Sequence, residues 1–465
     1  MVQGLAKLQQ EELSRFRQFV RSPYYNQREE LSVLLEYFLQ FWPDIAAGPL
    51  DKEAAFEAVL PGQEYEDKQL RYRMSWLNKL LEQFWLAEQQ GSEGLRNSSL
   101  LMDQLSERGL HKAYRQTERQ LEEALKQEES KDAEYFRCRL RWAEARERDF
   151  QRKRQRRYDP ALQEASDQLD RYYFLKRLMF ACAMLDRQAI LQADYQPGLS
   201  PDWLQHLEAQ AFFGEPLIEI YYFIFKALQE EADESHFRRL RSKLEEISEK
   251  VSRARLQEIY HVTINYCARK IRRGKEAYVG EALQLYTTGI EQGILLEKEE
   301  LSPWTFTNVV KLALRLKRYG WIENFIQRYA PRLPDAFREN ALHYNLAELY
   351  YYTERHDEAQ LHLNQVAYSD LNYYLGARTM LAKIYYEQDE EEPLLSLLAA
   401  FTIFLKRNKE LSGQIKQTFL HFCELLYQLV RRRPEKLQPL GERIQQTSPL
   451  TDKAWLLEQW KKKVK

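Results

Sequence analysis

The chain has 465 residues, and its 69 basic and 70 acidic side chains give a formal net charge of −1. A charge this close to zero excludes a global attraction to nucleic acid or to an anionic membrane. The sequence holds only 16 glycines and 15 prolines, whereas good helix formers such as Leu, Glu, Gln, Arg, Lys and Ala dominate it. We therefore expect an all-α protein of about 20 helices with short connections and almost no β-sheet.

The cysteines and the apolar segments indicate the cellular compartment. Cys138, Cys182, Cys267 and Cys423 are widely separated within helical patterns, which is typical of buried thiols in a reducing compartment and not of a disulfide framework. The first ten residues lack the apolar region of a signal peptide, and the uncharged run at 394–405 is too short to span a bilayer. These features predict a soluble, cytoplasmic protein without membrane association.

Residues 1–90 form a candidate N-terminal helical module. Apolar periodicity predicts helices around 13–20, between Asn26 and Pro43, between Asp51 and Leu60, and around 70–84, with Asn26 and Asp51 as N-caps. The short helix before Pro61 and the helix after it are similar to the helix-turn-helix part of winged-helix activators, although no wing strands follow. The resemblance implies DNA binding. The alternative is a helical bundle that caps the rest of the chain.

Longer helices are expected in the region 95–195, over 95–108, 110–128, 131–153 and 160–193. The segment 137–157 contains ten basic residues against three acidic ones, a density that can neutralise phosphates. The same segment also carries an apolar stripe that includes Phe136, Leu140, Ala143 and Phe150. We favour the interpretation that the arginines form the solvated face of a scaffold helix next to acidic residues 118–132.

The region 200–465 contains the clearest internal repeat. Helical pairs are predicted at 217–228 with 236–247 and at 256–271 with 282–290, followed by a connection over 293–303. One short pattern then occurs at 312–316, 346–350 and 381–385, with spacings of 34 and 35 residues. A fixed period of this size predicts stacked helix–turn–helix units. Further helices are expected at 411–430, after Pro434, and from Thr451, where Trp455, Leu456 and Trp460 can cover the last unit.

The middle copy carries a family resemblance. Its residues are Tyr344-Asn345-Leu346-Ala347 with Tyr350, then Asp357-Glu358-Ala359, Leu363 and Val366. They resemble a tetratricopeptide (TPR) repeat, and the resemblance is clearest over 305–404. It implies an α-solenoid of antiparallel helix pairs, in which small residues at 347 and 359 let the two helices touch. Three regions are therefore expected: an N-terminal module over 1–90, a long-helix region over 95–195 and a repeat array over 200–465 with a C-terminal capping helix.

The resemblance also implies a site. In TPR repeats the first helix of each pair lines a concave groove, and the corresponding positions here are Lys317, Arg318, Tyr344, Glu348, Tyr351, Tyr352, Thr379, Lys383 and Tyr386. Residues 344, 348 and 351 share one helix face by their spacing. The carboxylate-clamp variety of the family prefers Lys and Asn where this chain has Tyr344 and Glu348, so the expected partner is another peptide or protein segment and not a chaperone tail. Alternatively, these tyrosines pack against a neighbouring helix.

Sequence signatures of catalysis are absent. None of the eight histidines forms a His-Glu-x-x-His motif or a zinc-binding spacing, and there is no Gly-rich phosphate loop, dinucleotide fingerprint or Gly-x-Ser-x-Gly. We therefore expect no catalytic, cofactor or metal site. The sequence favours a non-enzymatic scaffold or sensor that binds other proteins through TPR-like repeats. The alternative is a nucleic-acid-associated regulator that joins a helix-turn-helix-like module to a repeat sensor.

Overall fold

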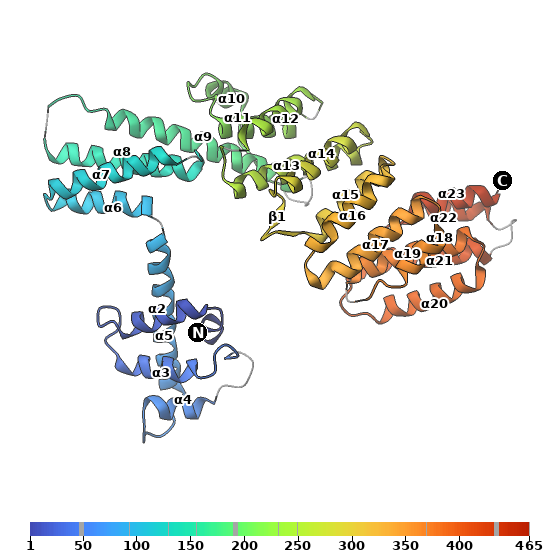
Figure 1. Cartoon of the computed structure of the whole chain (residues 1–465), viewed down its shortest axis with the longest axis horizontal. Coiled ribbons are helices and arrows are strands. Elements are labelled where there is room, and N and C mark those ends of the chain that lie inside the picture. The colour runs from blue at the N-terminus through green and yellow to red at the C-terminus, as the bar shows by residue number, and fades with distance from the viewer. Residues whose placement is uncertain are drawn as a thin grey trace. The chain divides into compact units, whose positions relative to one another are not determined.

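The computed structural model describes residues 1–45, 51–92, 94–128, 130–154, 156–188, 194–230, 232–248, 250–368, 370–431 and 437–464 (Figure 1). Over these residues the fold is all-helical, as expected, with 23 α-helices, one short 3-10 helix and one two-stranded hairpin. The chain forms two compact units, Met1–Arg177 and Leu178–Lys465. The division into three regions stays a prediction. The expected end of one helix at 193 lies outside the described residues. Pro434, after which a further helix was expected, also lies outside them.

The first unit consists of helices only over its described residues. Their bounds are α1 Val2–Leu5, α2 Gln10–Arg21, α3 Glu29–Leu39, α4 Lys52–Val59, α5 Asp67–Ser92, α6 Gly94–Glu107, α7 His111–Gln127, α8 Ala133–Arg152 and α9 Ala161–Gln188, within which the unit boundary falls. The first five helices enclose a core over residues 5–84 that includes Phe16, Phe38 and Phe84. A second core, around Trp142, lies between α6, α7 and α8.

The two expected N-caps of the first unit have different outcomes. Asp51 caps α4, since its Oδ1 accepts the backbone N–H of Ala54 at 3.0 Å. Asn26 does not cap α3, which begins after Arg28. Its side chain instead donates to the carbonyl of Val20 at 2.8 Å and accepts from the N–H of Arg28 at 2.9 Å, and these bonds hold the turn between α2 and α3. The capping prediction for Asn26 was wrong because the helix starts two residues later than the polar side chain suggested.

The second unit contains the repeats. Its elements are α10 Pro201–Glu208, α11 Pro216–Gln229, α12 Ser235–Ile247, α13 Arg253–Arg272, α14 Ala277–Glu291, β1 Leu296–Glu297, β2 Glu300–Leu301, α15 Pro303–Arg315, α16 Tyr319–Tyr329, η1 Ala330–Arg332, α17 Asp335–Tyr352, α18 His356–Leu363, α19 Leu371–Glu387, α20 Glu391–Arg407, α21 Gly413–Arg431, α22 Gln438–Gln446 and α23 Lys453–Val464. The small antiparallel hairpin lies in the connection 293–303 and pairs Leu296 with Leu301. No described helix is both long and apolar enough to cross a bilayer.

One turn recurs along the second unit. In each copy a residue with positive φ follows the first helix, and the next N–H donates to a carbonyl five residues back, as in a Schellman cap. The positive-φ residues are Gly274, Lys317, Glu354 and Asp389, and the bonds run from Lys275 to Lys270, Arg318 to Ala313, Arg355 to Tyr350 and Glu390 to Tyr385. The same turn therefore joins α13 to α14, α15 to α16, α17 to α18 and α19 to α20.

Neighbouring helices of the second unit pack in chain order (Figure 1). Each of α15, α17 and α19 contacts the helix that follows it, and α17 also contacts both α15 and α19. Ala347 of α17 and Ala359 of α18 are fully buried. The last core includes Phe401, Phe422 and Leu456, and α23 packs against α21 and α22. This order places corresponding faces of α15, α17 and α19 next to one another.

Candidate functional site

A cavity of about 710 Å³ lies against α15, α17 and α19. Residues of α21 and of the turn before α23 close it on another side. Its lining consists of Lys311, Leu314, Arg315, Tyr344, Glu348, Tyr351, Tyr352, Asn372, Gly376, Thr379, Met380, Lys383, Phe419, Thr451 and Asp452. The volume suits one or two large side chains or a small molecule. We call it the α17 cavity.

The structure brings six of the nine expected groove residues together in the α17 cavity. They are Tyr344, Glu348, Tyr351, Tyr352, Thr379 and Lys383. Tyr386 lines a separate cavity of about 380 Å³ next to α23. Lys317 and Arg318 do not line the α17 cavity, because α15 ends at Arg315 and both residues lie in the exposed turn that follows. By the 34-residue spacing, these two residues correspond to Tyr351 and Tyr352, which are still helical in α17. The alignment of the two sequence copies therefore does not hold at the end of α15.

Glu348 is the most unusual group in the cavity wall. It is only 7 % exposed, and its Oε1 accepts a hydrogen bond of 3.1 Å from the Tyr344 hydroxyl. The ammonium of Lys311 lies 3.8 Å from the same oxygen, while Oε2 has no hydrogen-bond partner among the described residues. Burial raises the pKa of Glu348, and the nearby charge of Lys311 only partly opposes this effect. A half-satisfied buried carboxylate is costly unless another group uses it.

Tyr344 holds Glu348 in place from the neighbouring turn of α17. Its ring is 8 % exposed and lies against α19 at Gly376. A Cβ at position 376 would lie 2.8 Å from the ring and from its hydroxyl, so a side chain there would displace Tyr344. Burial raises the pKa of Tyr344, and the neighbouring Glu348 carboxylate raises it further. Tyr344 therefore acts as a buried donor to Glu348 and not as an exposed anchor.

Lys383 is held by the C-terminal part of the chain. Its ammonium pairs with Asp452 at 2.9 Å and lies over the rings of Tyr351 and Trp455, at 4.8 Å and 5.6 Å from their centroids. Tyr351 and Trp455 both donate to Oε1 of Glu387, at 2.8 Å and 2.6 Å. These contacts tie α19 to the start of α23. The charge of Lys383 is thus compensated within the chain.

Several lining residues were missed from the sequence. Lys311 and Arg315 lie four residues apart on α15, a spacing that places them on one helix face. That spacing could have identified them instead of Lys317 and Arg318. Arg315 also pairs with Glu276, the residue before α14, with 2.9 Å between its Nε and a carboxylate oxygen. No sequence signal indicated Phe419 or Asp452, because they reach the cavity from distant parts of the chain.

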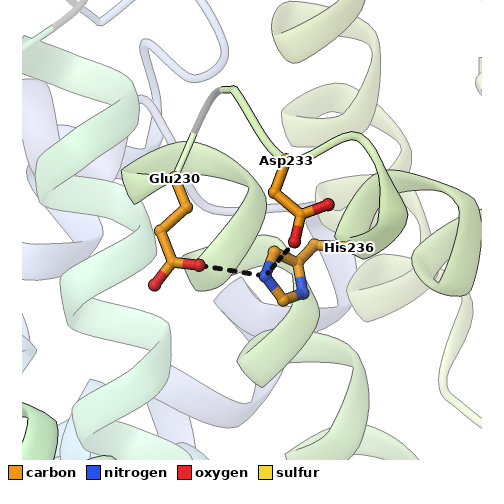
Figure 2. A group of neighbouring side chains, drawn as sticks. All are labelled: Glu230, Asp233 and His236. Carbon is orange, nitrogen blue, oxygen red and sulfur yellow. Dashed lines mark hydrogen bonds and ion pairs between the residues drawn. The ribbon is translucent and has the colours of Figure 1, made fainter.

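A second cluster consists of Glu230, Asp233 and His236 at the start of α12 (Figure 2). The Nε2 atom of His236 lies 3.1 Å from Glu230 and 3.4 Å from Asp233. Lys226 pairs with the other oxygen of Glu230, and the Asp233 carboxylate accepts the N–H of Ser235 at 2.8 Å. Both carboxylates are therefore engaged by donors of the chain itself. The arrangement serves as an ion-pair network that fixes the beginning of α12.

The basic segment 137–157 lies largely on α8 within the first unit. Six of its ten basic side chains pair with carboxylates, namely Arg137, Arg139, Arg146, Arg148, Arg152 and Lys153. The pairs of Arg148 with Asp103 at 2.8 Å and Arg152 with Glu107 at 3.1 Å connect α8 to α6. Exposed pairs of this kind contribute little stability each. They do reduce the positive charge that this helix presents.

Comparison with family models, curated proteins and solved structures finds no match to this chain. The TPR resemblance of the middle repeat thus stays a prediction from its residues. The α17 cavity and the side chains around it are therefore the structural evidence for function.

Proposed function

We propose that the chain is a non-enzymatic interaction protein whose α17 cavity receives a segment of a partner protein. The observation that carries this proposal is that six positions selected as partner contacts line one cavity. Helical spacing already places 344, 348 and 351 on one face of α17, and the structure adds that Thr379 and Lys383 of α19 line the same cavity. The exposed ring of Tyr352, with 54 % of its surface accessible, offers contact area that a partner can cover.

The same proposal includes the finer architecture of the second unit, an α-solenoid of antiparallel TPR-like helix pairs. The recurring positive-φ turn after α13, α15, α17 and α19 supports it. The packing of α17 against both α15 and α19 supports it as well, since solenoid units contact their neighbours in chain order. In such an array, the first helices of successive pairs provide one continuous binding face.

The closure of the cavity restricts how a partner segment binds. Phe419, Thr451 and Asp452 line the side that α21 and the turn before α23 provide. A long peptide lying straight through the cavity would meet these residues. We therefore propose that a partner inserts one or two side chains while its backbone stays near the exposed Tyr352.

A peptide-display selection on the full chain tests this function. Random peptides are selected on the parent protein, and the recovered peptides are then measured against Tyr352→Ala and Met380→Trp. The first variant removes exposed contact area, and the second fills the cavity. We expect at least a tenfold loss of affinity in both, which corresponds to about 1.4 kcal/mol. Lys317→Ala is the matched control, because this exposed residue lies outside the cavity.

Circular dichroism and thermal melting establish that each variant is folded before binding is compared. Recovered peptides that bind all three variants as tightly as the parent would contradict the proposal, as would a selection without enrichment.

A nucleic-acid-associated regulator is the alternative. It has weaker support, because six of the ten basic side chains of the segment 137–157 pair with carboxylates and no strand lies among the described residues of the first unit.

A further inference from the structure

We infer that the α17 cavity receives an arginine side chain of the partner segment, with the Glu348 carboxylate as its counter-ion. This inference rests on the proposed function and specifies the chemistry of the occupant. Its starting point is Oε2 of Glu348, a buried carboxylate oxygen without a hydrogen-bond partner in the described chain. Other buried polar atoms of the described residues also lack a partner, but Glu348 lines the α17 cavity, where a ligand can supply the missing donor.

Three of the other charged groups of the cavity have close partners of opposite charge. Lys383 pairs with Asp452 at 2.9 Å, and Arg315 pairs with Glu276, the residue before α14. Lys311 is the cation nearest to Glu348, but its ammonium stays 3.8 Å from Oε1 and its side chain is 53 % exposed. An incoming anion would compete with Glu348 for Lys311. An incoming cation would compete with Lys311 for Glu348, whose second oxygen still lacks a donor, and this oxygen is the feature that favours a cation here.

The position of Glu348 allows a ligand to reach it. The Tyr344 hydroxyl holds Oε1 from the same helix. The terminal torsion of a glutamate is soft, so a small rotation of the whole carboxylate can present Oε2 to a donor. The cavity of about 710 Å³ is large enough for an extended arginine side chain.

Aromatic rings favour a guanidinium over an ammonium. Tyr352 lines the cavity with an exposed ring and lies edge to face with Tyr351, with ring centroids 5.7 Å apart, while the Tyr351 ring already carries the ammonium of Lys383. A guanidinium is planar and weakly hydrated, so it stacks on such rings and loses less solvation than an ammonium when it is buried. Lysine should therefore bind more weakly than arginine at the same position.

The first test uses small probes and the full-length chain. N-acetyl-arginine N-methylamide is titrated while the melting temperature is measured, alongside the citrulline and glutamate analogues. A ligand that binds only the folded state raises the melting temperature with concentration. We expect a saturable rise with the arginine probe and none with the other two, since citrulline has the same shape but no charge. Stabilisation by the glutamate probe, or equal stabilisation by citrulline, would overturn the inference.

Two variants assign the effect to Glu348. Glu348→Gln keeps the shape and removes the charge, so the arginine probe should bind at least tenfold more weakly. Lys311→Gln removes the competing cation, so the same probe should bind severalfold more tightly. An anion site would give the reverse for Lys311→Gln, and this result would overturn the inference even if Glu348→Gln fails to fold. Lys317→Gln, which removes an exposed charge outside the cavity, should change nothing.

The selected peptides separate the inference from the proposed function. Cavity-dependent peptides should contain an arginine whose replacement by glutamine abolishes binding and whose replacement by lysine weakens it. Cavity-dependent peptides without any basic residue would overturn the inference and leave the function standing. If the free arginine probe binds but no peptide depends on the cavity, the occupant is a small molecule and both proposals fail.

Discussion

Glu348 shows how one residue can conflict with the local rules of a helix and still be informative. It lies in the middle of α17, where burial disfavours a charge, and its neighbours satisfy only one of its two oxygens. A hydrophobic residue of similar size would fit such a position at lower cost. The persistence of an incompletely paired carboxylate is understandable if its charge serves a ligand, because functional sites often reduce stability.

We predict that Glu348→Gln stabilises the ligand-free protein by about 1 kcal/mol at neutral pH, since an incompletely satisfied buried charge is replaced by a neutral amide. Burial raises the pKa of Glu348 above its usual value of 4.5, so the folded state holds the proton more tightly than the unfolded state. The free energy of unfolding of the parent should therefore fall as pH rises from about 4.5 through the raised pKa. The glutamine variant should lack this contribution.

Thermal melting of parent and variant between pH 5 and 8 measures this difference. The stability gap should widen towards higher pH and then become constant. Tyr344→Phe is a useful companion, because it removes the one hydrogen bond to the carboxylate and should destabilise the protein. If Glu348→Gln is less stable than the parent at every pH, the carboxylate is structurally satisfied and our account of it is wrong.

At the scale of elements, the turns between paired helices are the most regular feature of the second unit. Lys317, Glu354 and Asp389 adopt φ values of 54°, 59° and 56°, and Gly274 occupies the equivalent position with 82°. Left-handed backbone is unfavourable for residues with a Cβ and natural for glycine. The chain thus tolerates strain at three of these four turns.

We predict that Lys317→Gly, Glu354→Gly and Asp389→Gly each stabilise the protein by about 0.5–1 kcal/mol, because relief of left-handed strain exceeds the added entropy of the unfolded chain. Gly274→Ala is the matched reverse change. A Cβ there meets nothing within 4 Å, so its cost of about 1 kcal/mol arises from the backbone alone. Melting temperatures of the four variants check both signs. A loss of stability in the three glycine variants would show that their side chains contribute more than the strain removes.

At the scale of the whole molecule, charge balance argues against nucleic acid as the partner. The net charge is −1, and Arg146, Arg148 and Arg152 of α8 pair with carboxylates of α6, α7 and α9 within the first unit. Nucleic-acid binding depends on cations that are available to replace counterions around phosphates. Paired arginines can contribute only if they first break these contacts.

We predict little binding of the full chain to DNA or RNA at physiological salt. Fluorescence anisotropy with labelled duplex DNA and single-stranded RNA, measured across a salt series, checks this expectation. Submicromolar binding with a steep dependence on salt would contradict it. Loss of such binding in Arg152→Glu combined with Arg156→Glu would locate it on the basic segment and favour the alternative function.

The sequence by itself determined the all-α fold class. Glycine and proline are scarce and good helix formers are abundant, and this composition predicted an all-helical chain. The prediction works because helix propensity is a property of each residue and its local backbone. The spacing of 344, 348 and 351 placed these residues on one side of α17, since the helical period fixes which side chains share a face. Six of the nine groove residues line the α17 cavity for this reason.

Only the tertiary structure decided what that face contacts. Asp452 pairs with Lys383 from 69 residues away, and Phe419 lines the same cavity from α21. The periodicity of one helix carries no information about such distant segments. Lys317 and Arg318 lie outside the cavity because α15 ends at Arg315 and a left-handed turn follows at Lys317. The alignment with the middle copy had predicted that both residues are helical. Helix faces follow from local spacing, whereas partners across a cavity follow from long-range packing.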